Sequence, residues 1–186
     1  MGVTGQFADQ VEWQGEPYYV TAVDGTGLFE AAGAQATSTA CYRGYVASYR
    51  IDDGNLVLVE LETGQAYDGA HLGVSPVPDR GVHLYQALAV PVAFTGRLLI
   101  GAGYADIGRL NMGFPPAYGF QRVWELIFDA GRLIIAHERS SDLAAVREHL
   151  AGVRPGPAEG EATTQWVDRT FSLSFGYSWP DISVNG

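Results

Sequence analysis

Lysine is absent from the 186-residue sequence, so all 11 basic residues are arginine. They stand against 21 acidic residues, which gives a formal net charge of -10 at pH 7. An acidic surface repels phosphate backbones, and the arginines do not cluster into a stripe that would overcome this repulsion. The composition therefore argues against nucleic-acid binding and favours a basic protein partner.

Cysteine and long apolar runs are also scarce. Cys41 is the only cysteine, so neither an internal disulfide nor a thiolate zinc cage is expected, and Cys41 is predicted to be a small core residue. No apolar run approaches the roughly eighteen residues of a membrane span. The start, MGVTGQFADQ, lacks the pattern of an export signal, and Gln6 stands where a myristoylation signal needs Ser or Thr. We expect a cytoplasmic protein without a membrane contact.

The common catalytic and metal-binding motifs are missing as well. The nucleophile elbow G-x-S-x-G and the zinc motif H-E-x-x-H do not occur. His137 and His149 can share a metal only if a helix folds back onto a strand. The Gly101-Ala102-Gly103 stretch lacks the third glycine of a dinucleotide fingerprint. We predict no catalytic residue, no metal and no cofactor, and favour a protein that is not an enzyme.

What the sequence has is a strong β pattern, centred on residues 38–61. Asp53-Gly54 separates two apolar runs and is typical of a type I′ hairpin turn. A two-residue loop places Ile51 opposite Leu56, Tyr49 opposite Leu58 and Ala47 opposite Glu60. The core face is then Tyr45, Tyr49, Ile51, Leu56 and Leu58. The other face, with Val46, Val57, Val59 and Leu61, is only slightly more polar, which indicates a central element of the sheet.

Further hairpins are predicted at 10–23 and at 120–138, and apolar strand runs flank Thr95-Gly96 within 82–101. One short helix is predicted near 141–151, because Leu143, Val146 and Leu150 recur at helical spacing before Gly152. These elements indicate a mainly β, β-rich α+β fold, an antiparallel meander of hairpins forming a curved sheet or barrel.

The length and the hydrophobic fraction of 47% favour a single domain over 1–186. Residues 1–9 are predicted to be a loose N-terminus. Residues 152–165 read as a linker-like loop before a C-terminal strand at 170–175. Residues 102–119 are too rich in glycine for a regular element, and a loop of this length is usually functional or mobile.

The stretch STACYRGYVA at 38–47, followed by IDDGNL at 51–56, resembles a group of small, uncharacterised bacterial proteins. In that group a similar S-T-A-C, aromatic, R-G, aromatic stretch precedes a D-x-G-x-L turn. The resemblance implies a bacterial intracellular origin. No activity is established for the group, so it implies nothing about mechanism.

Arg43 is the most suggestive single residue, because it places a charge within an aromatic β run on the same face as Tyr45. A buried arginine needs an acidic partner, and Glu60, Glu62 and Glu125 are the candidates. Such a pair either bridges two strands or forms an anion or carboxylate clamp that opens to a pocket.

Aromatic residues in loops form a second candidate set: Tyr104, Phe114, Tyr118, Tyr177 and Trp179. Aromatic residues set among glycine and proline either anchor their loops to the body or serve, with arginine, as contact hot spots. Tyr104, Arg109 and Tyr118 are the binding candidates of this set.

Two functions follow from these candidates. The first is a non-enzymatic acidic bacterial interaction module that binds a protein partner through Tyr104, Arg109 and Tyr118, in the manner of an immunity-type inhibitor. The second is a β-barrel small-molecule binding protein or enzyme, in which Arg43, Tyr45 and Glu60 line a cavity. An open, polar pocket at Arg43 favours the second function, whereas a solid interior with Arg43 fully bridged to a glutamate argues against it.

Overall fold

The computed structural model describes residues 5–66, 72–106, 112–153 and 156–182. Within these ranges the chain is β-rich, as predicted, and its strands form one 10-stranded mixed sheet. The strands are β1 (Gln10–Trp13), β2 (Glu16–Thr26), β3 (Tyr45–Asp52), β4 (Asn55–Thr63), β5 (Val77–Asp79), β6 (Val82–Tyr85), β7 (Val90–Pro91), β8 (Thr95–Tyr104), β9 (Phe120–Asp129) and β10 (Arg132–Glu138).

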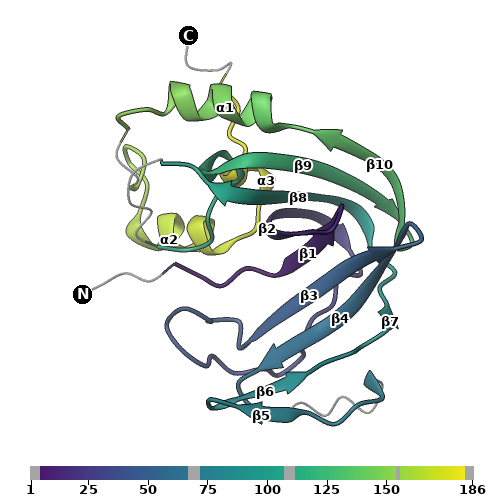
Figure 1. Cartoon of the computed structure of the whole chain (residues 1–186). Coiled ribbons are helices and arrows are strands. Elements are labelled where there is room, and N and C mark those ends of the chain that lie inside the picture. The colour runs from purple at the N-terminus through teal and green to yellow at the C-terminus, as the bar shows by residue number, and fades with distance from the viewer. Residues whose placement is uncertain (1–4, 67–71, 107–111, 154–155, 183–186) are drawn as a thin grey trace.

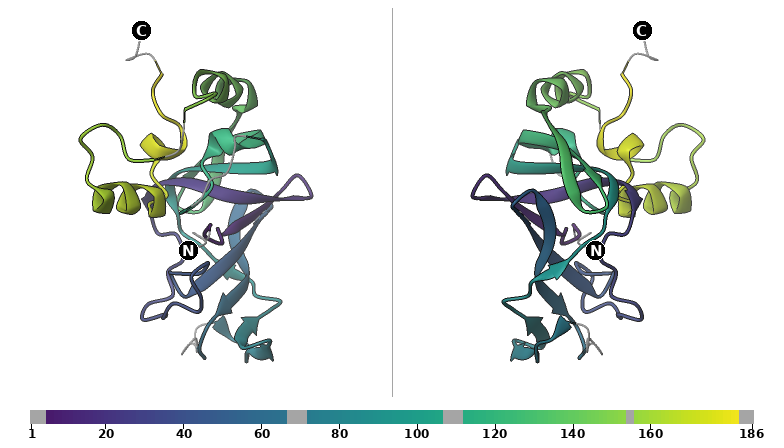
Figure 2. Two further views of the ribbon diagram at one scale, coloured as in Figure 1. Left: turned by 90° about the vertical axis from the view of Figure 1, so that its left-hand side faces the viewer. Right: turned by 90° about the vertical axis from the view of Figure 1, so that its right-hand side faces the viewer.

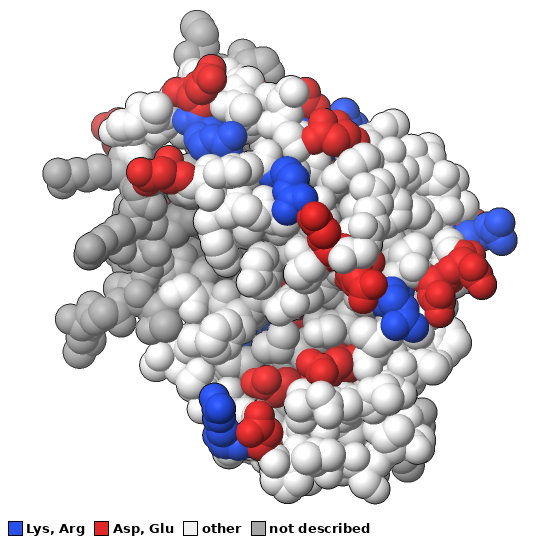
Figure 3. Space-filling view, viewed as in Figure 1, with Lys and Arg blue, Asp and Glu red and all other residues white. Residues whose placement is uncertain are grey.

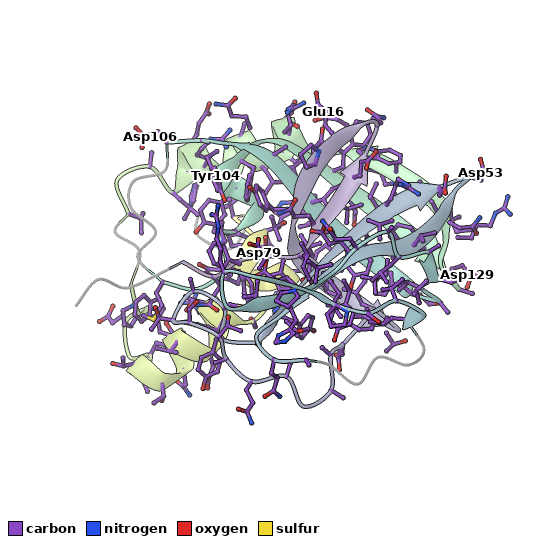
Figure 4. All side chains as sticks on the ribbon, turned by 60° about the horizontal axis from the view of Figure 1, so that its bottom comes forward. Glu16, Asp53, Asp79, Tyr104, Asp106 and Asp129 are labelled. Atoms are coloured by element: carbon purple, nitrogen blue, oxygen red, sulfur yellow. The ribbon has the colours of Figure 1, made fainter. Side chains whose placement is uncertain are left out.

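The sheet curves into a ring-like arrangement (Figure 1). Its order is β10-β9-β8-β2-β1-β3-β4-β6-β5, with β7 beside β4, and β10 also pairs with β4 through Arg132 and Asn55. The hairpin turns that hold Asp53 and Asp129 lie at one end of the molecule, while Tyr104 and Asp106 lie toward the other (Figure 4). The curved sheet that the hairpin pattern predicts is therefore present.

The central hairpin is confirmed, with one correction to its register. Ile51 lies opposite Leu56 and Tyr49 opposite Leu58, as predicted, but a β-bulge between Ser48 and Tyr49 shifts the rest of the ladder. Ala47 consequently faces Leu61 rather than Glu60, and Leu61 is fully buried. An extra residue on one strand exchanges the two faces beyond it, and no turn residue signals its position.

The hairpins β1–β2 and β9–β10 are also confirmed. The meander is not antiparallel throughout, because β1 pairs in parallel with β3 and β8 lies between β2 and β9. Thr95-Gly96 is not a hairpin turn but the start of β8, and the runs before it pair with β4. The long connection over 27–44 carries the chain across β1, which allows a parallel neighbour.

The main hydrophobic core fills the inside of the ring. Its largest fully buried members include Tyr49, Phe94, Leu58 and Ile100. Cys41 is buried and donates its thiol to the Tyr45 carbonyl at 3.6 Å, which confirms it as a core residue. The interior is thus packed with side chains.

In a second, smaller core, α1 (Ser140–His149) packs against β9, and Leu143 of the helix lies with Leu99 of β8 and Val123 of β9. The helix predicted near 141–151 is confirmed. The helices gather at one end of the molecule, and the β5–β6 hairpin extends from the opposite end (Figure 2).

The predicted C-terminal strand at 170–175 is wrong. The chain forms α2 (Thr163–Phe171) and α3 (Phe175–Ser178), so the linker-like loop ends before Thr163. Only Ser172 to Ser174 are extended, and the Leu173 carbonyl accepts one hydrogen bond from the Val23 amide at 2.7 Å. The alternating T-F-S-L-S-F pattern therefore describes a short link between two helices that docks on β2.

Residues 5–9, predicted to be loose, are fixed to the body. Gln6 donates to the Thr39 carbonyl at 2.7 Å and accepts from the Tyr42 amide at 2.9 Å, while Ala8 and Asp9 are buried. Small polar residues gave no sign of this docking, because its partners lie more than thirty residues away in the sequence.

None of the helices within the described ranges is long and apolar enough to cross a membrane. Acidic side chains are scattered over the face seen in Figure 3, with arginines beside several of them. The face carries no broad basic field.

Candidate ligand recess at the Asp9 and Arg43 pair

A tight turn over residues 38–44 presents Arg43 immediately before β3. The Cys41 amide donates to the Ser38 carbonyl at 3.1 Å, and the Gly44 amide to the Cys41 carbonyl at 3.2 Å. Gly44 has a φ of 78°, and a Cβ there would lie 2.3 Å from the Gln35 carbonyl oxygen. Only glycine fits this close approach, so the turn fixes where Arg43 leaves the backbone.

The acidic partner of Arg43 is Asp9, not Glu60, Glu62 or Glu125. The two side chains form a bidentate pair, with Nη1 donating to Oδ2 at 3.0 Å and Nη2 to Oδ1 at 2.7 Å. Asp9 Oδ1 also accepts from the Ala47 amide at 2.9 Å. The Asp9 side chain is 1% exposed and that of Arg43 is 25% exposed, so only the arginine reaches solvent.

Aromatic rings hold the guanidinium from two sides. Arg43 Cζ lies 4.8 Å from the Tyr45 ring centre and 5.3 Å from that of Phe114. Burial lowers the pKa of Arg43, but the charge and hydrogen bonds of Asp9, with smaller contributions from Tyr45 and Tyr49, raise it above its usual value overall. The pair is therefore charged and rigidly oriented.

Burial raises the pKa of the Tyr45 hydroxyl to about 12. The carboxylates of Asp9 and Glu30 add to this increase, and Arg43 opposes it. At neutral pH Tyr45 is thus a neutral phenol that can donate and accept a hydrogen bond. Its ring also meets that of Phe29 edge-on, at 6.3 Å between centres.

A recess of about 690 Å³ lies beside this pair. Its walls come from the end of β2 and the loop after it, from the Arg43 turn, and from the extended link between α2 and α3. The lining residues are Asp9, Val23, Gly25, Thr26, Gly27, Leu28, Phe29, Glu30, Arg43, Tyr45, Ser172, Leu173 and Ser174. This volume is within the range of small-molecule sites, which is roughly 300–1,000 Å³.

Two hydroxyls of the lining already have hydrogen-bond partners. Ser172 Oγ donates to the Arg169 carbonyl at 2.8 Å and lies 3.1 Å from Ser174 Oγ, so the serine hydroxyls interact with each other and with backbone. Neither histidine nor cysteine lines the recess, whereas the carboxylates of Asp9 and Glu30 do. Among the described residues, no group of three or more His, Cys, Asp or Glu is arranged to hold a metal ion.

Of the five predicted site residues that the structure describes, only two lie together in the recess. Arg43 and Tyr45 share the recess, whereas Glu60 lies elsewhere on β4 and accepts from Gln86 Nε2 at 3.3 Å. Tyr104 is 61% exposed and its ring lies 4.9 Å from that of Phe120. Tyr118 is half-buried against the smaller core. Arg109 lies outside the described residues.

The other loop aromatics serve as anchors. Phe114 and Tyr177 are buried, and Trp179 packs against the smaller core. Sequence reasoning also missed Asp9, Glu30, Ser172 and Ser174 as recess residues. Their only shared signal is a polar side chain beside an apolar one, which is too common to identify a site.

Comparisons with known proteins give no further guidance: no family model matches the chain, and searches of curated proteins and of solved structures found no match.

Proposed function

We propose that this chain is a non-enzymatic binding protein that takes a small polar ligand into the recess beside Arg43. The observation that carries the proposal is the recess itself, which opens next to an arginine already held by Asp9 and two aromatic rings. Because these groups are fixed before a ligand arrives, binding costs little ordering of side chains.

The test fills the recess. Thr26 is exposed and lines the recess, so T26W places an indole in it. The matched control is T164W, at an exposed threonine of α2 outside the lining. Both variants and the natural chain are incubated with a bacterial metabolite extract and examined by native mass spectrometry. We expect a retained small molecule on the natural chain and on T164W, and its loss from T26W. Equal retention on all three chains would contradict the proposal.

A second function, binding of a basic protein partner in the manner of an immunity-type inhibitor, is favoured by Tyr104. Its exposed ring is supported by Tyr19 at 5.8 Å and Phe120 at 4.9 Å, so it presents a fixed apolar surface on an acidic protein. Rigid aromatic residues are frequent hot spots. Both functions are proposed for a bacterial cytoplasm, an origin and location that stay predictions.

Tyr104→Ala tests this second function in a pull-down from lysate. Capture of a partner should be lost while the Tm is unchanged, because the ring is mostly exposed. Tyr42→Ala is the control, since Tyr42 is 71% exposed and contacts Phe171 on α2, away from Tyr19 and Phe120. Tyr118 is unsuited to the test, because truncating a half-buried ring also lowers stability.

A further inference from the structure

The recess has an uneven charge balance. Its charged lining residues are Asp9, Arg43 and Glu30. Asp9 and Arg43 neutralise each other through two hydrogen bonds, so their net contribution is near zero. Glu30 forms no hydrogen bond or ion pair with any residue that the structure describes. Among the described residues, one carboxylate of the recess therefore has no cationic partner.

Glu30 is exposed, and it lines the same recess as Tyr45. Burial is the main cause of the raised pKa of the Tyr45 hydroxyl, and the charge of Glu30 adds to it. The net charge of the whole chain, -10, has the same sign. An anionic ligand would be repelled here, and Arg43 offers little in return because Asp9 already compensates its charge.

The remaining lining residues suit a cation with an apolar body. The hydroxyls of Ser172, Ser174 and Tyr45 can accept hydrogen bonds, and an ammonium or amidinium group only donates them. Leu28, Phe29 and Leu173 supply apolar contact around these acceptors. Such a site of apolar walls with a few convergent polar groups is typical of small-molecule recognition.

We propose that the recess selects an organic cation, whose ammonium, amidinium or guanidinium group pairs with Glu30 while its apolar part lies against Phe29 and Leu173. This inference rests on the proposed function and names its ligand class. The same cationic group occurs in free amines and in the arginine or lysine side chains of a basic protein, so the chemistry is shared by two sources.

Three compounds of one shape and different charge test the selectivity: benzamidine (cationic), benzamide (neutral) and benzoate (anionic). Each is titrated into the full chain while the backbone amide signals of Gly25, Gly27 and Tyr45 are followed by NMR. We expect benzamidine to bind about five- to tenfold more tightly than benzamide, as one partly screened charge pair allows, and benzoate most weakly. In E30Q benzamidine and benzamide should bind equally. E148Q, which removes an exposed charge of α1, should keep the preference.

The outcomes separate the two proposals. Equal binding of all three compounds at the recess would support a binding site and overturn its charge selectivity, as would an unchanged preference in E30Q. If none of the compounds shifts the three amides, the recess is not a binding site for such ligands and both proposals fail. The peptide Gly-Gly-Arg-Gly-Gly is titrated alongside: binding tighter than benzamidine indicates a protein side chain as the source, and weaker binding indicates a free small molecule.

Discussion

Asp9 and Glu125 are both buried carboxylates that pair with arginine. The two sites differ in what lies next to the arginines. Asp9 binds one arginine and the Ala47 amide, and both Asp9 and Arg43 line a recess. Glu125 lies between two arginines, with Arg97 Nη1 at 3.3 Å and Arg139 Nη2 at 2.7 Å.

The C-terminal segment covers the Glu125 site. Arg97 Cζ lies 4.1 Å from the ring centre of Phe175, and Arg139 Cζ lies 5.4 Å from that of Trp179. Both rings belong to α3 or its immediate end. The charges of this site therefore fasten α3 to the sheet, whereas the charges of the Asp9 site frame a space. A buried arginine pair alone does not indicate function, and what covers its open side is the informative feature.

The largest expected effect is that of Asp9→Ala. The change leaves Arg43 and the buried Ala47 amide without their acceptor, so we expect a loss of about 4 kcal/mol in the free energy of unfolding. Urea denaturation measures it. Asp52→Ala is the control, because Asp52 is 60% exposed in its pair with Arg50 and should cost less than about 0.5 kcal/mol. A loss below about 1 kcal/mol for Asp9→Ala would mean that the pair does not hold the site, contrary to the comparison.

Glu125→Ala should cost less, about 2 kcal/mol, because Arg97 and Arg139 are 44% and 30% exposed and can be hydrated once the acid is gone. The change should also loosen α3, which Asp9→Ala should leave intact. Hydrogen exchange of the Ser178 and Trp179 amides measures this, since both donate within α3. Equal exchange in the two variants would show that the two sites are not separate in function.

The fold was predictable where it depends on local chemistry. Asp53-Gly54 and Asp129-Ala130-Gly131 specify their turns through residues that tolerate positive φ, and both hairpins are present. The order of strands was not predictable, because the parallel pairing of β1 with β3 depends on where a long loop crosses. No residue pattern marks the bulge at Ser48 and Tyr49 either. The predicted register was therefore right between the turn and the bulge and wrong beyond it.

The smaller part of the candidate site was predictable, for the same reason. Arg43 and Tyr45 were identified because Arg43 places a charge in an aromatic run. A buried charge is costly unless it is paired, so such a residue stands out as a site candidate. The partner was missed because Asp9 is 34 residues away and lies in a segment with no strand pattern. Ser172 and Ser174 reach the recess only because α2 and α3 place the link between them against β2, and the alternating pattern there predicts a strand.

Phe175→Leu sharpens the claim that aromatic cover matters at the Glu125 site. Leucine keeps apolar contact but removes the ring over Arg97, so we expect a loss of about 1 kcal/mol in the free energy of unfolding. Phe7→Leu is the matched control, because Phe7 is 60% exposed and should change the unfolding free energy by less than about 0.5 kcal/mol. If the two substitutions cost the same, the ring over Arg97 contributes nothing beyond its area.

The smallest expected effect is a pH dependence of the free energy of unfolding that comes from the Asp9 site alone. Tyr45 has a titratable hydroxyl, whereas Phe175 and Trp179 over the Glu125 site have none. Its pKa is raised to about 12 in the folded chain, from about 10 when unfolded. The unfolded state therefore loses its proton first, and the stabilisation that is complete below pH 10 declines as the pH rises toward 12. This linkage lowers the free energy of unfolding by about 0.8 kcal/mol by pH 10.5.

Tyr45→Phe should remove that part of the decline, which urea denaturation between pH 8 and pH 10.5 measures, whereas Phe175→Leu should keep it. A decline of the same size in Tyr45→Phe would mean that the hydroxyl is not buried beside Asp9 and Glu30.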